Sequence, residues 1–208
     1  MDQALLSAAG RAIGFMPEEE GLALHDAALT AADGGPLLEI GSYCGKSSIY
    51  LGAAAREKET VCFSIDHHRG SEEHQVGEEF HDKRVTDDEG RVDTLHEFRK
   101  NIVAAGLEDV VVGVVGRSDV VASWWKTPLG LVFIDGGHSR EAAFADFEGW
   151  SPHVAEGGLL VIHDVFEDPN EGGRPPFEIY QRALESGKFQ QVSETGSLRA
   201  LQRVGDGV

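Results

Sequence analysis

Two short apolar runs in this chain end abruptly in side chains that can bind a metal ion or move a proton. One run leads into Asp135 and, after two glycines, His138; the other leads into His163 and Asp164. Apolar runs of four or five residues are typical of buried parallel strands, and open α/β sheets bind their ligands at the carboxyl ends of such strands. We therefore expect these four side chains to meet in one crevice.

This group of carboxylates and imidazoles suits metal binding and proton transfer. His138, with Asp135 beside it, is the expected catalytic base, because an imidazole titrates near neutral pH. Asp135 and Asp164 are expected to hold a divalent cation, Mg²⁺ or Mn²⁺, that lowers the pKa of the bound hydroxyl. His163 would be a further metal ligand or a brace for Asp164. Structural roles stay open as well, with Asp135 as a helix cap and His138 as a residue that orients its loop.

The elements that must position these residues alternate between strands and helices. Repeated βα units imply a doubly wound α/β sheet that is mostly parallel, with right-handed crossovers. Helices within residues 1–33 are expected to form an N-terminal cap, and a terminal strand pair turning at Gly196 adds an antiparallel C-terminal strand. The expected strands are 37–40, 60–65, 110–115, 130–134, 158–162, 189–194 and 197–203, and the expected helices are 18–32, 47–56, 92–105, 120–125, 140–149 and 177–186.

The sequence contains no repeat, linker or low-complexity tract, so residues 1–208 are predicted to form a single domain. A chain of 208 residues is long enough for one α/β domain with a full core. Residues 67–90 carry many charges and histidines but little apolar pattern, which favours a lid or acceptor-binding segment above the sheet.

The overall charge narrows the classes of partner. The formal net charge is -18, so the protein should repel phosphate backbones, and we expect no nucleic-acid partner. No apolar run approaches the ~18 residues needed to span a bilayer, and the N-terminus lacks a signal-peptide pattern. Cys44 and Cys62 form no CxxC pair and lie in or beside apolar segments, as expected in a reducing compartment. These features predict a cytoplasmic enzyme without a membrane partner.

A glycine turn follows the first predicted strand. Gly41 and Gly45 let the backbone turn sharply and approach a ligand closely, and the helix that starts near Ser47 offers free N–H groups. A phosphate-binding P-loop needs four residues between its glycines, and only three separate these two. A dinucleotide fingerprint needs a glycine where Tyr43 stands. The pattern that remains begins at the acidic residue Glu39 and ends at the second glycine.

Asp66 lies at the end of the second predicted strand. A carboxylate there can accept hydrogen bonds from both hydroxyls of a ribose. Together with the glycine turn, Asp66 favours a bound nucleoside over a purely structural turn. The neighbouring His67 is expected to touch the ribose or the acceptor.

On these residues the chain resembles the class I S-adenosylmethionine-dependent methyltransferases along nearly its whole length. The resemblance rests on the segments 39–45, 116–118 and 135–138 and on Asp66. Within that class the chain is most similar to the metal-dependent small-molecule and sugar O-methyltransferases related to the macrolide-sugar and cephalosporin enzymes. Those enzymes usually carry two carboxylates after the fifth strand, where this chain has His163 and Asp164.

The resemblance implies which residues hold the cofactor S-adenosylmethionine. It assigns the glycine turn to the methionine end, Asp66 to the ribose and the segment 116–118 to the adenine. The expected cofactor-binding residues are Glu39, Ile40, Gly41, Ser42, Tyr43, Gly45, Ser47, Asp66, His67, Gly116, Arg117, Ser118 and Asp135, and the expected metal ligands are Asp135, His163 and Asp164.

The expected function is therefore O-methylation of a small polar acceptor, most simply a sugar or oligosaccharide. Aromatic residues make up only 8% of the chain, and the acidic, histidine-rich segment 67–90 favours a polar acceptor over a flat aromatic one. Three alternatives stay open: a catechol-type O-methyltransferase, a metal-dependent phosphohydrolase that uses the His163–Asp164 pair, and a non-catalytic binder of an adenosine ligand. Relatives often dimerise, so a homo-oligomer, most simply a dimer, is expected by analogy.

Overall fold

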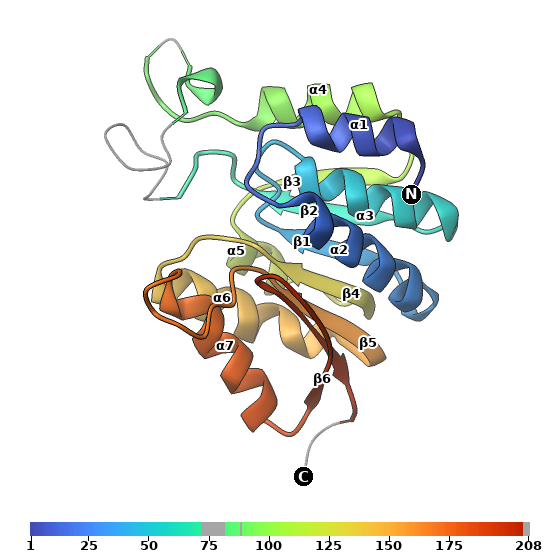
Figure 1. The fold of residues 1–208 in the computed structure, drawn as a ribbon, viewed down its shortest axis with the longest axis vertical. Coiled ribbons are helices and arrows are strands. Elements are labelled where there is room, and N and C mark those ends of the chain that lie inside the picture. Colours follow the sequence, from blue (N-terminus) through green and yellow to red (C-terminus); the bar gives the residue numbers. More distant parts are fainter. Residues whose placement is uncertain (72–81, 88, 206–208) are drawn as a thin grey trace.

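A seven-stranded sheet runs through the middle of the protein, with helices on both faces (Figure 1). The computed structural model describes residues 1–71, 82–87 and 89–205. The strands follow the order β3-β2-β1-β4-β5-β7-β6 across the sheet. They are β1 (Leu37–Ile40), β2 (Cys62–Asp66), β3 (Val111–Val115), β4 (Leu129–Ile134), β5 (Val154–Ile162), β6 (Phe189–Thr195) and β7 (Leu198–Arg203).

The direction of the strands confirms the predicted fold class. Strands β1 to β5 pair in parallel, whereas β7 runs antiparallel to both β5 and β6. The result is a Rossmann-like α/β sheet, mostly parallel, with antiparallel pairing confined to the C-terminal strands. Because β1 and β4 lie side by side at the centre, the segments that follow them emerge together at one edge of the sheet.

The helices divide between the two faces. One face carries α1 (Gln3–Arg11), α2 (Glu18–Ala31), α3 (Lys46–Glu57) and α4 (Leu95–Ala105), and the other carries α5 (Ser118–Ala122), α6 (Arg140–Trp150) and α7 (Arg174–Glu185). Side chains alternate along β1 accordingly: Leu37 packs in the core beneath α1 to α4, and Leu38 and Ile40 pack in the core beneath α5 to α7. None of the helices in the described residues is long and apolar enough to cross a membrane.

Several element boundaries differ from those expected from the sequence. The helix expected over 92–105 begins only at Leu95, because Val92 pairs with Thr86 in an isolated bridge. The short helix expected at 120–125 lies at Ser118–Ala122. The helix expected at 177–186 begins earlier, at Arg174, with a proline in its first turn. Proline fits there because the first N–H groups of a helix have no partner within the helix.

Gly41 stands where β1 and β4 come closest. Its φ of 90° lies in the left-handed region, and a Cβ on this residue would overlap the carbonyl oxygen of Asp135. Backbone bonds fix this point on both sides: Gly41 N donates to Ile65 O of β2 at 3.0 Å, and Asp135 N donates to Ile40 O of β1 at 3.0 Å. Only glycine fits both the backbone angle and the space.

We predict that Gly41→Ala lowers the free energy of unfolding by more than about 2 kcal/mol, because it adds left-handed strain to a steric overlap with backbone. Gly116→Ala is the matched control, since the nearest atom to its added Cβ would be a side-chain methyl 3.9 Å away. Urea denaturation followed by circular dichroism measures both variants. Equal losses of stability in the two would contradict this account.

Candidate active site

A cavity of about 960 Å³ opens at the carboxyl ends of β1, β2 and β4. Most of the residues expected to bind a cofactor line it. These are Ile40, Gly41, Tyr43, Asp66, His67, Gly116, Arg117, Ser118 and Asp135. The segments that follow four separate strands thus converge on one space, as the parallel topology requires.

The other expected cofactor residues do not line this cavity: Glu39, Ser42, Gly45 and Ser47. Gly45 has a φ of 84° and caps the start of α3, and its N–H donates to the carbonyl of Ser42 at 2.7 Å. These residues support the glycine turn but do not line the cavity. Their direct contact with a cofactor stays a prediction.

The Asp66 carboxylate links two backbone segments at the cavity by hydrogen bonds. Its Oδ2 accepts a hydrogen bond from the Tyr43 N–H at 2.8 Å, and its Oδ1 accepts one from the His68 N–H at 2.7 Å. Tyr43 and His68 both have left-handed backbones, with φ of 45° and 59°. The carboxylate therefore stabilises two strained turns at once, and its remaining lone pairs can accept bonds from a ligand.

Glu39 is buried completely beneath α3. Ser48 Oγ donates a hydrogen bond to its Oε2, while its Oε1 has no hydrogen-bond partner among the described residues. Burial raises the pKa of Glu39 to about 7, although hydrogen bonds from neighbouring serines oppose the rise. The carboxyl group is thus neutral below that pH and costs stability when it ionises.

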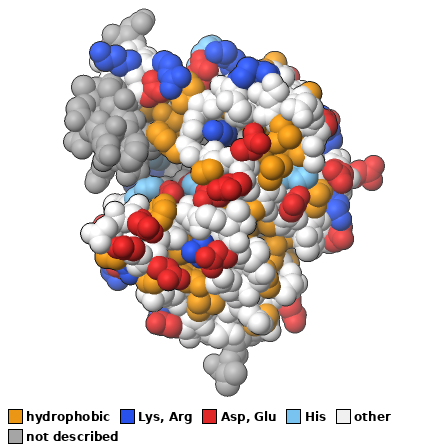
Figure 2. All heavy atoms as spheres, in the orientation of Figure 1, with side chains coloured by type: hydrophobic (Ala, Val, Ile, Leu, Met, Phe, Trp, Pro, Cys, Tyr) orange, Lys and Arg blue, Asp and Glu red, His pale blue; other side chains and the backbone are white. Residues whose placement is uncertain are grey.

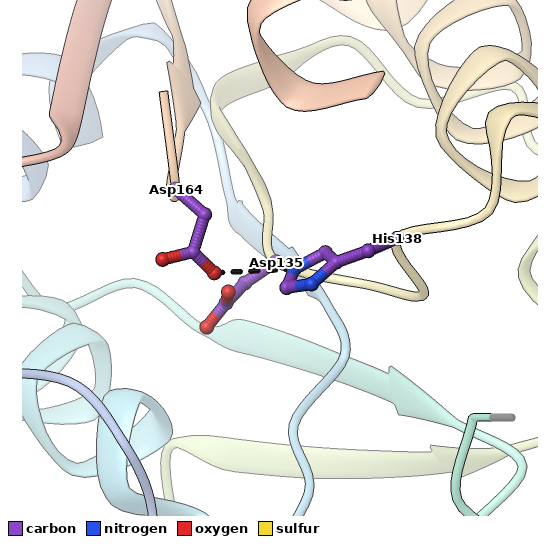
Figure 3. A group of neighbouring side chains, drawn as sticks. All are labelled: Asp135, His138 and Asp164. Carbon is purple, nitrogen blue, oxygen red and sulfur yellow. Dashed lines mark ion pairs between the residues drawn. The ribbon is translucent and has the colours of Figure 1, made fainter. Parts of the chain in front are cut away.

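Three of the four side chains expected to form a reactive site meet in one cluster. Donor atoms of Asp135, His138 and Asp164 all lie within 4.8 Å of one another, at the ends of β4 and β5 (Figure 3). His138 Nε2 lies 3.1 Å from Asp164 Oδ2. Asp164 has a left-handed backbone with a φ of 56°, which turns its carboxylate toward the cluster. The geometry suits either a divalent cation or a histidine base oriented by a carboxylate.

His163 lies behind this cluster rather than in it. Its Nδ1–H donates to Asp135 Oδ1 at 3.0 Å, and its Nε2–H donates to Glu20 Oε2 at 2.6 Å. Burial disfavours its charged form, but the surrounding carboxylates raise the pKa of His163 well above its ordinary value. Both ring nitrogens thus already face carboxylates, which supports the bracing role over direct metal ligation.

The carboxylates around this imidazolium differ in their acidity. Burial raises the pKa of Asp164, but hydrogen bonds from His138 and His163 outweigh it and lower the pKa below its ordinary value. Glu20 behaves in the same way, with its bonds to His163 and Ser197 outweighing burial. For Asp135 burial prevails and the pKa is raised. Glu20 and Asp164 therefore favour their charged forms more than Asp135 does.

Two buried acidic residues lie at the site although the sequence did not predict them. Glu20 is one of three glutamates in the first turn of α2, and those read equally well as charges at a helix N-terminus. It reaches inward to His163 and also accepts the Ser197 N–H at 2.6 Å. Asp146 on α6 lines the cavity, and burial raises its pKa to about 6. No local pattern distinguishes either residue from its exposed neighbours.

The segment expected as a lid, 67–90, is described only in part. Residues 72–81 and 88 lie outside the described residues. In the part that is described, His67 lines the cavity, and His68 is buried, with its Nδ1 2.8 Å from Thr94 Oγ1.

Comparisons with known proteins find a matching sequence family and similar folds. Residues 38–165 match the family described as a methyltransferase domain. The O-methyltransferase TomG from Streptomyces achromogenes, involved in tomaymycin synthesis and solved in complex with SAM, is 17% identical with a TM-score of 0.66, over 99% of this chain and 91% of that chain. The O-methyltransferase NovP is 16% identical with a TM-score of 0.70, over 90% and 81%. SAH-bound PaMTH1 from Podospora anserina is 12% identical with a TM-score of 0.69, over 99% and 89%. At these identities the likeness shows a common fold.

We predict that Glu39→Gln changes stability in a pH-dependent way. The folded pKa of about 7 lies above the ordinary value of 4.5, so the wild type loses stability as pH rises through this window. Relative to wild type, the variant should therefore gain about 2 kcal/mol between pH 5.5 and pH 8.5. Urea unfolding at the two pH values measures the gain. Glu156→Gln, an exposed control, should show none, and a pH-independent difference for Glu39→Gln would refute the assignment.

Proposed function

The chain belongs to the methyltransferase domain family, and on that premise we propose that it transfers a methyl group from S-adenosylmethionine to a hydroxyl of a small polar acceptor. One observation carries the proposal. The cavity that contains the glycine turn and Asp66 also contains Asp135 and His138, so a nucleoside-binding end and a reactive end share one space.

The proposed cofactor contacts follow the lining of the cavity. Asp66 accepts the ribose hydroxyls, the turn at Gly41 and Tyr43 faces the methionine end, and the segment 116–118 borders the adenine. Ser118 is already oriented, because its Oγ accepts the indole N–H of Trp150 at 2.7 Å. Arg117 is held beside Asp119 at 2.7 Å at the cavity wall.

His138 acts as the general base in this proposal. Methyl transfer is an in-line displacement at a sulfonium carbon, so the protein must align the acceptor oxygen and remove its proton. Asp164, 3.1 Å from His138 Nε2, orients the ring and stabilises the imidazolium that forms. His163 in turn fixes the carboxylate of Asp135 from behind.

The donor set also fits a divalent cation. Two carboxylates and an imidazole within 4.8 Å of one another are ligands that Mg²⁺ or Mn²⁺ accepts, so Asp135 and Asp164 would hold the ion, with His138 next to it. When bound, such an ion would lower the pKa of the acceptor hydroxyl. His163 is proposed as the brace of these ligands, because both of its nitrogens already bond to carboxylates.

A sugar or oligosaccharide is the proposed acceptor. This choice follows the proposed resemblance of the sequence to the mycobacterial sugar 1-O-methyltransferase of methylmannose polysaccharide synthesis. A single domain over residues 1–208, a cytoplasmic location and assembly as a homodimer belong to the same proposal. Titration calorimetry with S-adenosylhomocysteine, with and without Mg²⁺, tests the cofactor class directly: micromolar binding supports the proposal, and its absence under both conditions overturns it.

We predict that Asp66→Ala weakens S-adenosylhomocysteine binding by about 1–3 kcal/mol, the range for lost hydrogen bonds to a charged group. Asp109→Ala, which changes an exposed carboxylate away from the cavity, is the control and should bind as the wild type does. Calorimetry measures both. Unchanged affinity in Asp66→Ala would remove the ribose assignment.

We predict that His138→Ala lowers turnover by roughly 10²-fold or more, the usual contribution of a general base, while S-adenosylhomocysteine still binds. His96→Ala, an exposed histidine on α4, is the control. Mn²⁺ affinity of the same variants, measured by electron paramagnetic resonance, separates base from ligand. Retained Mn²⁺ binding supports a base, whereas its loss would make His138 a metal ligand instead.

We predict that EDTA suppresses turnover and that Mg²⁺ or Mn²⁺ restores it, because Asp135 and Asp164 provide the oxygen ligands of a divalent cation. The assay follows S-adenosylhomocysteine release after chelation and after metal is added back. Full activity in chelator would restrict both carboxylates to positioning and proton handling.

A further inference from the structure

A second cavity, of about 560 Å³, lies against the reactive cluster from another side. Its walls come from the linker between α1 and α2, the segment after β5 and the turn between β6 and β7. Asp164 lines this second cavity, and its Oδ2 is 3.1 Å from the Nε2 of His138, which lines the first. The two spaces therefore meet at the residues that would perform the transfer.

The linker between α1 and α2 connects the two cavities. Phe15 lines the second cavity with 61% of its surface exposed, and its ring centroid lies 6.0 Å from that of Tyr43, which lines the first. Lys46 Nζ donates to the carbonyl of Gly14 at 3.4 Å, which ties the linker to the start of α3. Phe166 provides a second aromatic side chain. Aromatic faces of this kind pack against ring carbons and attract cations.

The charges around the second cavity are mainly negative. Glu167 and Glu171 line it from exposed positions, and neither carboxylate forms an ion pair in the described part of the chain, although Arg174 donates to the backbone carbonyl of Glu167 at 3.0 Å. The cations that line it are engaged: His163 bonds to Glu20 and Asp135, and Arg199 pairs with Glu194 at 3.2 Å and donates to the Gly196 carbonyl at 2.8 Å. Acidic side chains are also scattered over much of the face in Figure 2. An anionic acceptor would be repelled here and a cationic one attracted.

We propose that the second cavity holds the methyl acceptor and that the acceptor is a hydroxylated amine, such as an amino sugar, whose ammonium group faces Glu167 and Glu171 while its hydroxyl lies at Asp164. This inference rests on the proposed methyltransferase function and specifies its substrate class. In the transfer, the bond between the methyl carbon and sulfur breaks and a bond between that carbon and the acceptor oxygen forms. Sulfur keeps the electron pair as a thioether, and the hydroxyl proton passes to His138.

Three probes with one ring and three charges test the substrate class. They are the methyl glycosides of glucosamine, glucose and glucuronic acid, each titrated by calorimetry into wild-type protein saturated with S-adenosylhomocysteine, and each assayed for turnover with S-adenosylmethionine. We expect the amine to bind at least roughly tenfold more tightly than the neutral sugar, and the acid to bind most weakly. Equal binding of the three, a preference for the acid, or no binding by any of them overturns the proposal.

A charge-neutral variant tests the assigned residues. Glu167→Gln combined with Glu171→Gln should reduce the preference for amine over neutral sugar by at least about tenfold, because it removes the paired carboxylates but keeps their size. Glu156→Gln, exposed and outside both cavities, should keep the wild-type preference. An unchanged preference in the double variant removes these glutamates from the site. Titration with S-adenosylhomocysteine alone keeps the two proposals separate, since only its failure contradicts the methyltransferase function.

Discussion

The buried imidazolium of His163 connects the parts of the molecule on which the site depends. It bonds to Glu20 from α2 on one side and to Asp135 after β4 on the other, and Glu20 in turn accepts the backbone N–H of Ser197 between β6 and β7. Segments from the two ends of the chain are thereby joined at the floor of the site. Removing one partner of such a buried pair leaves an unpaired charge, at a cost of about 3–5 kcal/mol, so the network constrains all of these segments together.

The same network explains how two carboxylates can lie side by side. Asp135 and Asp164 both contact His163, at 3.0 and 3.4 Å, so the positive ring offsets part of their mutual repulsion. This chain thus places His163 beneath the cluster. The net negative charge at the proposed metal site is therefore smaller than three carboxylates would give. A smaller negative charge lowers the affinity of the site for a cation.

The sheet and the reactive cluster could be predicted from the sequence because both depend on local patterns. Apolar runs that end in polar residues marked β4 and β5, and parallel topology then brought Asp135, His138 and Asp164 within 4.8 Å. The methyltransferase family, predicted from the resemblance carried by the segments 39–45, 116–118 and 135–138 and by Asp66, is confirmed by the match over residues 38–165. Glu20 and Asp146 could not be found in this way, since only tertiary packing distinguishes a buried acid from the exposed acids beside it on the same helix. Helix α7 begins before the expected range 177–186 because its prolines fit a first helical turn, where no N–H partner within the helix is lost.

The two cavities are bounded by different kinds of structure. The first is bounded largely by backbone: the turn at Gly41, the bonds from Asp66 to two N–H groups, and the glycines after β4. Such features depend on the fold more than on individual side chains. The second cavity is bounded by side chains from three connecting segments, which vary most freely within a fold. Likeness to known folds therefore informs the proposed methyl donor, whereas the acceptor has to be read from the side chains of this chain, Phe15, Glu167 and Glu171 among them.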